Sequence, residues 1–283
     1  AIIMAIVAVY LYKFCVKHNW TIRMPEAVPE GVSRSFTALI PTAVIALVVM
    51  VINGSLVLLG TDIFKMISIP FSFVTNLTST WIGVIIIEFL IHALWIVGIH
   101  GANIISAFIT PILLTNMAAN AKGAHIPFAG EFNNSFAIMG GSGATLGLCL
   151  FIAFAARSEQ LKVLGRASLA PAFFNINEPL IFGLPIVYNP YLAIPFFLAP
   201  MASASLAYAA FYFRLINPII TQAPWPSPIG FGALISTVDI RAVIVAILCG
   251  IVAFLIWFPF IKLYDAKLVN DEKQVAAGKE AEA

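Results

Sequence analysis

Glu178 is the acid whose surroundings most suggest chemistry. It lies in the run Asn175-Ile176-Asn177-Glu178-Pro179, and no other charged residue occurs between Arg166 and Arg214. A carboxylate at membrane depth costs roughly 2.5–3.5 kcal/mol unless it is paired or hydrated. Asn and Pro are poor helix-interior residues, so the helix is expected to break here. Broken backbone in a membrane is tolerated where it lines a cavity or is buried in protein. One acid, two amides (Asn175 and Asn177) and a broken helix therefore predict a polar ligand site.

His100 is the second candidate, in the segment Trp95-Ile96-Val97-Gly98-Ile99-His100-Gly101-Ala102-Asn103. A neutral imidazole both donates and accepts hydrogen bonds, which suits a ligand hydroxyl such as that of a sugar. The glycines on either side are expected to loosen the backbone and leave room for a ligand. The alternative is a core histidine bonded to a backbone carbonyl.

Trp95 and Trp225 are candidate stacking surfaces, because the C–H face of a sugar ring packs well against an aromatic plane. Trp225 stands among Pro224, Pro226 and Pro228, so a regular helix is not expected there. The alternative for each tryptophan is an anchor at the membrane interface.

Glu88 and His92 are spaced i, i+4 and therefore share one helix face. They are either a structural pair that holds two helices together or part of a proton path, since intramembrane acids and histidines build such relays. The amides Asn53, Asn76 and Asn103 are expected to make hydrogen bonds between packed helices.

The composition is that of an integral membrane protein. Of the 283 residues, 61% are hydrophobic and only 10% are charged, with a mean hydropathy of +1.00, whereas soluble domains carry about 25% charged residues. The net charge of +2 and the scattered basic residues argue against nucleic-acid binding. The cysteines Cys15, Cys149 and Cys249 are expected to be small buried hydrophobes, so no metal site is predicted, and no cofactor either.

Long apolar runs predict an all-α, polytopic membrane protein. Apolar helices are expected at residues 1–17, 36–59, 81–98, 102–121, 136–156, 191–213 and 241–264. Residues 62–80 are interrupted at Pro70 and are predicted to form an amphipathic helix in the membrane interface. Residues 157–166 are predicted to be a short basic loop that faces the cytosol.

Two segments are too rich in proline for one straight helix. Residues 169–190 contain four prolines and are predicted to form a re-entrant hairpin, and residues 217–232 form a second irregular segment. Pairs of broken apolar segments point to a binding site built from discontinuous helices, as in transporters.

Four separated motifs resemble one family. Residues 175–190, which run from Asn175 through Glu178 and Pro185 to Pro190, look like the signature of the membrane IIC permeases of the bacterial phosphotransferase system. The lactose/cellobiose/diacetylchitobiose group fits best. Residues 24–36 (Met24 to Phe36), the Trp95–Asn103 segment and Gln222-Ala223-Pro224-Trp225 also fit. The motifs occur in the family's order, and the match covers about residues 1–265.

The resemblance implies a dimeric permease with about ten membrane helices and two re-entrant hairpins, in a bacterial cell membrane. Residues 1–60 would end an N-terminal dimerisation part whose first helices precede Ala1. Residues 61–265 would form the transport domain that binds substrate. The composition of residues 266–283, rich in Ala, Lys and Glu, itself predicts a charged, partly disordered cytosolic tail. The partners would be a disaccharide and the cytosolic IIB and IIA phosphotransfer proteins.

The family's pocket residues correspond to Glu178, His100, Trp95 and Trp225. The resemblance places Glu178 and His100 at the sugar's 6-hydroxyl, which takes a phosphoryl group from a phosphocysteine on IIB. Glu178 would act as general base and His100 would orient the hydroxyl. The chain takes part in phosphotransfer but has no cysteine that resembles the phosphorylated one.

Two other functions stay open from the residues. A proton-coupled sugar symporter could use Glu88, His92, His100 and Glu178 as a relay. A structural membrane subunit without substrate is the third class, although broken helices that hold Glu178 and Trp225 argue against it. Cellobiose, diacetylchitobiose and lactose all present a 6-hydroxyl, so the disaccharide is not predicted.

Overall fold

Every regular element that the structure describes is a helix. The computed structural model describes residues 2–23, 25, 30–61 and 78–282. These residues fall into two compact units, Ala1–Ser72 and Phe73–Ala283, which are considered separately below. The all-α prediction is confirmed for the described residues. The interfacial helix predicted at residues 62–80 lies almost wholly outside them, and so does Asn76.

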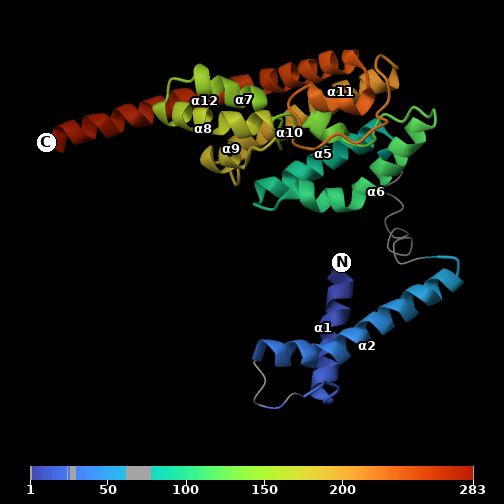
Figure 1. Ribbon diagram of the computed structural model, residues 1–283. Coiled ribbons are helices and arrows are strands. Elements are labelled where there is room, and N and C mark those ends of the chain that lie inside the picture. Colours follow the sequence, from blue (N-terminus) through green and yellow to red (C-terminus); the bar gives the residue numbers. More distant parts are fainter. Residues whose placement is uncertain (1, 24, 26–29, 62–77, 283) are drawn as a thin grey trace. The chain divides into compact units, whose positions relative to one another are not determined.

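The first unit consists of two helices that pack against each other, α1 (Ile2–Lys17) and α2 (Glu30–Leu58), drawn in blue in Figure 1. The helix α1 agrees with the predicted helix at residues 1–17. The helix α2 begins at Glu30 instead of near residue 36, and it continues through Pro41. Prolines are tolerated inside membrane helices because neighbouring groups or local adjustments satisfy the carbonyl that loses its partner.

The second unit opens with a helical hairpin. The helix α5 (Trp81–Ile96) leads through a tight turn into α6 (Gly101–Ala121), and the two helices contact each other. Gly98 in the turn has φ +80°, a left-handed conformation that favours glycine. A side chain at Gly101 would collide with the carbonyl of Ile91. These glycines therefore allow α6 to start close against α5, and this close approach positions the turn at residues 97–100 between the two helices.

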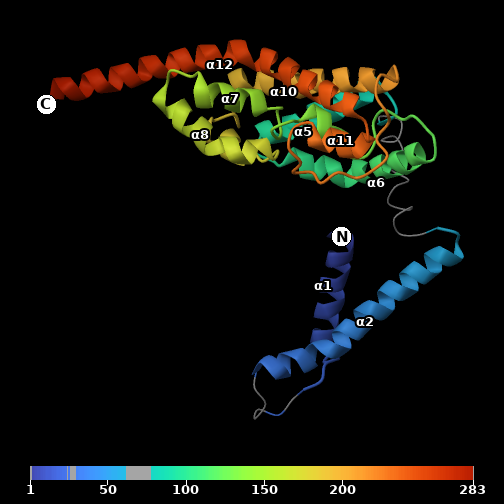
Figure 2. The ribbon, with the colours of Figure 1, turned by 45° about the horizontal axis from the view of Figure 1, so that its top comes forward.

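The centre of the unit is the pair α10 (Pro190–Tyr212) and α12 (Ile240–Glu282), which pack along each other, while α5 packs on α10. Figures 1 and 2 show this arrangement. Ser203 on α10 donates from Oγ to the carbonyl of Cys249 on α12 at 2.9 Å, and the Cys249 thiol lies 3.4 Å from the carbonyl of Ser203. Small residues at such a contact let two helix backbones approach closely.

The helix predicted at residues 136–156 is broken in the structure. A short π-helix, η2 (Asn133–Ala137), is followed by a loop and then by α7 (Leu146–Phe154). Gly140, Gly141 and Gly143 all have positive φ, and a side chain at any of them would collide with a neighbour. The apolar composition suggested a continuous helix, but the glycines make a packed loop that no other residue type could form without strain.

The prediction of a basic loop at residues 157–166 is also wrong, because these residues lie largely in α8 (Glu159–Phe173). Ser158 caps this helix by accepting a hydrogen bond from the Leu161 backbone. The chain then turns at Asn175, which has φ +62°, into the short helix α9 (Glu178–Gly183). Residues 169–190 therefore do not form one straight helix, as predicted. Their re-entry into a membrane stays a prediction.

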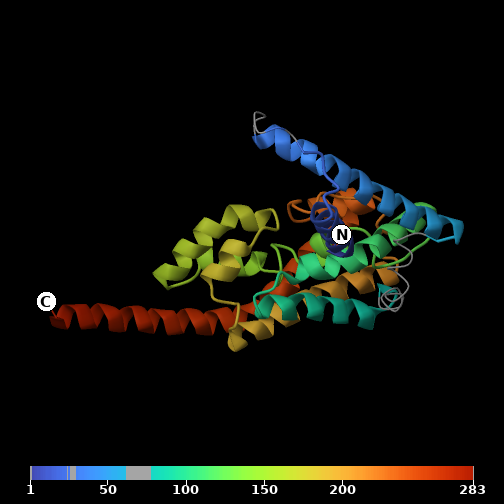
Figure 3. The same ribbon diagram turned by 90° about the horizontal axis from the view of Figure 1, so that it is seen from below.

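Two differences concern the C-terminal part. A short helix, α11 (Phe231–Thr237), follows the irregular segment at residues 217–230. The helix α12 does not end near residue 264 but continues to Glu282, which corrects the expectation of a partly disordered tail. Figure 3 shows its C-terminal end projecting beyond α7, α8 and α9.

Two carboxylates on α12, beyond Tyr264, bind the start of α8. Asp265, which is 5% exposed, accepts hydrogen bonds from the backbone N–H groups of Arg157 and Ser158 at 2.9–3.0 Å. Two turns further along α12, Glu272 accepts a hydrogen bond from the Ser158 hydroxyl at 2.6 Å. Negative groups are favourable at a helix N-terminus, where N–H groups lack intrahelical partners. These contacts fasten α12 to the start of α8.

Four of the described helical stretches are long and apolar enough to cross a membrane, namely Ser33–Leu58, Gly101–Ala121, Pro190–Tyr212 and Ile240–Val275. The helix α5 is apolar but shorter. This agrees with the prediction of several membrane-crossing helices.

Replacing Asp265 with alanine should lower the free energy of unfolding by about 1.5–3 kcal/mol, the usual range for hydrogen bonds to a charged group. The measurement is thermal unfolding of the purified protein in detergent. Asp271→Ala is the control, because it removes a nearby carboxylate on the same helix for which the structure records no bond to α8. Equal melting temperatures for the two variants would contradict the fastening role of Asp265.

Candidate functional site

One cavity of about 420 Å³ is bordered by all six predicted site residues. Ligand pockets in proteins commonly measure about 300–1,000 Å³. The six residues come from α5, from the turns before α6 and α9, from the start of α9 and from the loop before α11: they are Trp95, His100, Asn175, Asn177, Glu178 and Trp225. The structure therefore brings together residues that are far apart in the sequence. Their individual roles stay predictions.

Glu178 is the first residue of α9 and has an unsatisfied carboxylate oxygen. Its Oε2 atom is shielded from solvent and has no hydrogen-bond partner among the described residues. Its Oε1 atom lies 3.9 Å from Nε2 of His100. The side chain as a whole is 46% exposed, so Oε1, and not the shielded Oε2, is the oxygen that a ligand in the cavity can reach. A ligand hydroxyl is therefore expected to donate to Oε1.

His100 is held so that one ring nitrogen faces Glu178. It is the N-cap of α6, and its Nδ1 accepts a hydrogen bond from the backbone of Asn103 at 3.3 Å. In a neutral imidazole the other nitrogen, Nε2, then carries the proton. The 3.9 Å gap to Glu178 is too long for a direct hydrogen bond. A hydroxyl oxygen about 2.8 Å from each atom would fit between them, accepting from His100 and donating to Glu178.

The two tryptophans border the same space in different ways. Trp95 is 4% exposed, and its ring centroid lies 4.4 Å from that of His100. It therefore supports the imidazole as well as bordering the cavity. Trp225 is 53% exposed, and its backbone carbonyl accepts a hydrogen bond from Asn175 Nδ2 at 3.2 Å. An exposed indole beside a polar cavity is free to cover a ligand.

Asn175 and Asn177 direct their hydrogen bonds to the protein. Asn175 Oδ1 accepts from the Gly140 backbone at 2.8 Å. Asn177 Nδ2 donates to the carbonyl of Ser142 and to Thr145 Oγ1, both at 2.7 Å. Both residues border the cavity, but these contacts make them supports of its wall. A direct bond from either amide to a ligand stays a prediction.

Several residues that border the cavity were not expected there: Asn103, Ser106, Asn134, Gly141 and Ser142. Asn103 was assigned to helix packing, but it faces the cavity instead. Asn103 and Ser106 follow His100 at i+3 and i+6 on α6, and this spacing is the signal that could have found them, since such residues share a helix face. The glycine loop, residues 140–143, gave no such signal in the sequence, because only folding brings it to the cavity.

Glu88 and His92 do not border the cavity. Both side chains are fully buried, with His92 Nδ1 3.8 Å from Glu88 Oε2. His92 Nε2 accepts a hydrogen bond from the Gly143 backbone at 2.8 Å. The imidazole is therefore engaged in holding α5 to the glycine loop, which favours the structural alternative over a proton path.

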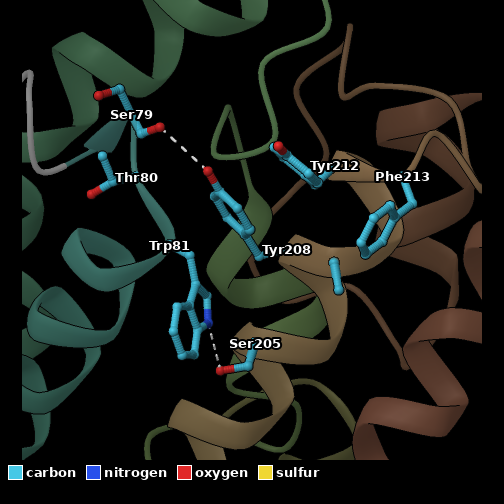
Figure 4. A pocket seen from close by; sticks show the side chains of 8 residues that line it. Ser79, Thr80, Trp81, Ser205, Tyr208, Tyr212 and Phe213 are labelled. Atoms are coloured by element: carbon cyan, nitrogen blue, oxygen red, sulfur yellow. Dashed lines mark hydrogen bonds between the residues drawn. The ribbon is translucent and has the colours of Figure 1, made fainter.

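A second, more aromatic cavity of about 590 Å³ lies between the start of α5 and the end of α10. Figure 4 shows Trp81 donating to Ser205 and Tyr208 donating to the carbonyl of Ser79, at 3.0 and 3.3 Å. None of the six predicted site residues borders it, so it is not part of the candidate site.

Comparison with known proteins decides the family. The sequence model of the phosphotransferase system EIIC family matches residues 1–200. The chain belongs to this EIIC family. The resemblance seen in the sequence is thereby confirmed, and the symporter alternative is not favoured.

Relatives of this EIIC chain include three curated proteins. The oligo-beta-mannoside-specific EIIC component of Bacillus subtilis (strain 168) is 35% identical over 279 residues, which are 94% of this chain and 62% of that protein. The lichenan permease IIC component of the same strain is 32% identical over 97% of this chain and 63% of that protein. The lactose-specific EIICB component of Streptococcus mutans serotype c (strain ATCC 700610 / UA159) is 32% identical over 99% of this chain and 51% of that protein.

A solved structure supports the fold. The crystal structure of the transporter ChbC, the IIC component of the N,N'-diacetylchitobiose-specific phosphotransferase system, superposes with a TM-score of 0.79 at 37% identity. The alignment covers 96% of this chain and 65% of ChbC. This EIIC chain thus spans between half and two thirds of the length of these relatives, and the predicted class of an all-helical membrane protein is confirmed.

Tyr188 connects the segment that carries Glu178 to the turn that carries His100. Its backbone N–H donates to the carbonyl of Ile96 at 2.9 Å, and its hydroxyl donates to that of Val97 at 2.8 Å. It does so in a left-handed conformation with φ +58°, which is uncommon for a bulky residue. These two bonds hold the end of α5 against the chain after α9.

For the disaccharide ligand proposed below, Tyr188→Phe should weaken binding by about 2- to 10-fold, because a lost hydrogen bond contributes about 0.5–1.5 kcal/mol. Titration calorimetry with cellobiose and lactose measures this. Tyr212→Phe is the control, since that exposed tyrosine borders only the second cavity. If the two variants bind equally well, Tyr188 does not hold the site together.

Proposed function

We propose that this chain forms the sugar-binding part of an EIIC permease that takes up a β-linked disaccharide. In this proposal the sugar enters the 420 Å³ cavity and its 6-hydroxyl lies between Glu178 and His100. The proposal rests chiefly on one observation. The Glu178 side chain is 46% exposed at the cavity, and its Oε1 faces Nε2 of His100 across a 3.9 Å gap that a hydroxyl oxygen would bridge.

The substrate class is taken from the relatives and from the lining. The matched proteins are described as specific for oligo-beta-mannosides, lichenan, lactose and N,N'-diacetylchitobiose. Their sugars share β-linkages and several hydroxyl groups. A cavity bordered by two tryptophans and several amides and hydroxyls offers stacking surfaces together with polar contacts, which is the chemistry such a ligand needs.

The chemistry follows from the residue types. His100 Nε2–H donates to the 6-hydroxyl oxygen and orients it. Glu178 accepts the hydroxyl proton as the oxygen attacks phosphorus, so it acts as general base. The new O–P bond replaces the S–P bond of a phosphocysteine, whose thiolate leaves. Cys15, Cys149 and Cys249 are all buried, so the phosphocysteine belongs to a separate IIB protein or domain, itself phosphorylated by IIA.

The same proposal includes the setting of the chain. It acts in the bacterial plasma membrane as part of a homodimer. Residues 1–60 belong to the dimerisation part, residues 61–265 form the transport domain, and residues 266–283 face the cytosol. The broken segments around Asn175 and Trp225 act as re-entrant hairpins. Phosphorylation retains the sugar, because the added charge of about −2 opposes its return through lipid.

Glu178→Gln should abolish most coupled phosphorylation and retain much of the sugar affinity. A general base typically contributes about 10²–10⁴-fold in rate, whereas the amide still offers a polar contact. Phosphorylation of labelled cellobiose by vesicles supplied with IIB, IIA and phosphoenolpyruvate is the measurement. Glu159→Gln is the matched control, because Glu159 is exposed and pairs with Lys162 on α8. Full activity of Glu178→Gln would remove the general-base role.

The form of the sugar inside vesicles tests the proposed class of transport. Sugar phosphate that appears only with phosphoenolpyruvate and the soluble phosphotransfer proteins is the expected result. Unmodified sugar that accumulates without them, and leaks when the proton gradient is collapsed, would instead indicate a symporter.

A further inference from the structure

The glycine loop at residues 140–143 forms part of the cavity wall and is held by three separate elements. Gly141 and Ser142 border the cavity. The Gly140 N–H is bound by Asn175 and the Ser142 carbonyl by Asn177. The Gly143 carbonyl accepts from Trp257 Nε1 on α12 at 2.8 Å. The remaining anchor comes from α5, where His92 binds the Gly143 N–H.

The loop depends on these anchors because it belongs to no helix. Its glycines have φ values of +80° (Gly140), +91° (Gly141) and +86° (Gly143). Glycine loses more conformational freedom on folding than any other residue, so a glycine-rich loop is ordered by external contacts. A side chain at Gly141 would meet Asn177, and one at Gly143 would meet Phe196. The loop is therefore fitted closely between its supports.

His92 has one arrangement of its ring nitrogens that satisfies both contacts. Its Nδ1 lies 2.6 Å from the backbone carbonyl of Glu88, so Nδ1 carries the proton and donates. Its Nε2 then holds the lone pair that accepts the Gly143 N–H at 2.8 Å. The side chain is fully buried and packs edge-on against Phe196, with 5.0 Å between the two ring centroids. No water or ligand is needed to complete these bonds.

The helix that carries His92 also carries Trp95 and leads directly to His100. Position 92 lies one turn before Trp95 on the same buried face of α5. The helix α5 therefore supplies the proposed sugar contact Trp95 and, through His92, an anchor of the glycine loop, and the turn that follows it carries His100. A shift of the loop relative to α5 would change the width of the cavity.

We propose that His92 is a positioning residue of the sugar cavity, which sets the glycine loop against Trp95 and His100 by accepting the Gly143 N–H. This inference rests on the proposed function of the cavity. His92 does not touch the sugar and takes no part in proton transfer. Its role is to supply an acceptor at Nε2 in a place where the loop N–H has no other partner among the described residues.

The test compares His92→Leu with His92→Gln. Leucine has a similar volume but no acceptor, and leaves the Gly143 N–H unsatisfied. Glutamine can place its Oε1 near the position of Nε2 and restore the bond. The control His125→Leu removes a histidine whose Nε2 bonds the Phe211 carbonyl at 2.7 Å, away from the cavity.

Two measurements are made on the complete protein purified in detergent. The first is the affinity for cellobiose and lactose. His92→Leu should bind about 5- to 150-fold more weakly, the effect of a buried unsatisfied N–H, while His92→Gln and His125→Leu bind within about threefold of the unmodified protein. The second is hydrogen exchange of the peptide that spans residues 139–147, which should be faster in His92→Leu and restored in His92→Gln.

The two measurements separate the possible failures. If the unmodified protein binds and His92→Leu binds equally well, with unchanged exchange, the role of His92 is overturned. The role is also overturned if His92→Gln loses as much disaccharide affinity as His92→Leu, because a hydrogen-bond acceptor at that position then does not matter. If the unmodified protein binds neither disaccharide, the proposed function fails, and the exchange data alone report whether His92 anchors the loop.

Discussion

Broken helices in an apolar region leave backbone N–H and C=O groups without intrahelical partners, and lipid offers none. The candidate site depends on how this constraint is met. The glycine loop at residues 140–143 interrupts one apolar run and the turn at Asn175 interrupts another. Side chains at the second break satisfy backbone groups of the first, because Asn175 binds the Gly140 N–H and Asn177 binds the Ser142 carbonyl. His92 and Trp257 complete the set.

This arrangement separates the residues that build the cavity from those that remain available to a ligand. The amide groups of Asn175 and Asn177 and the imidazole of His92 hydrogen-bond with protein groups. Oε1 of Glu178 and Nε2 of His100 lie 3.9 Å apart, beyond hydrogen-bonding distance, so both atoms remain available to a ligand. A cavity with satisfied walls and a few unsatisfied polar atoms is preorganised, because binding then requires little rearrangement of the protein.

Sequence reasoning succeeded where one residue's surroundings were informative. An isolated acid among apolar residues, a histidine between glycines and a tryptophan among prolines were each recognisable, and all border one cavity. It failed where apolar composition hid a break. Residues 136–156 were predicted as one helix, yet Gly140, Gly141 and Gly143 make a loop there. It failed again at residues 157–166, where polar residues suggested a loop but Ser158 caps a helix.

The sequence by itself determined that the chain is an all-helical membrane protein of the EIIC type, because hydropathy and short motifs are local properties. It also pointed to six residues that border one cavity, although it missed others such as Ser106 and Asn134. Only the tertiary structure decided that Asn175, Asn177 and His92 support the glycine loop, and that Asp265 fastens α12 to the start of α8. Hydrogen-bond partners separated by 35 to 108 positions leave no local pattern, since such contacts depend on how the helices pack.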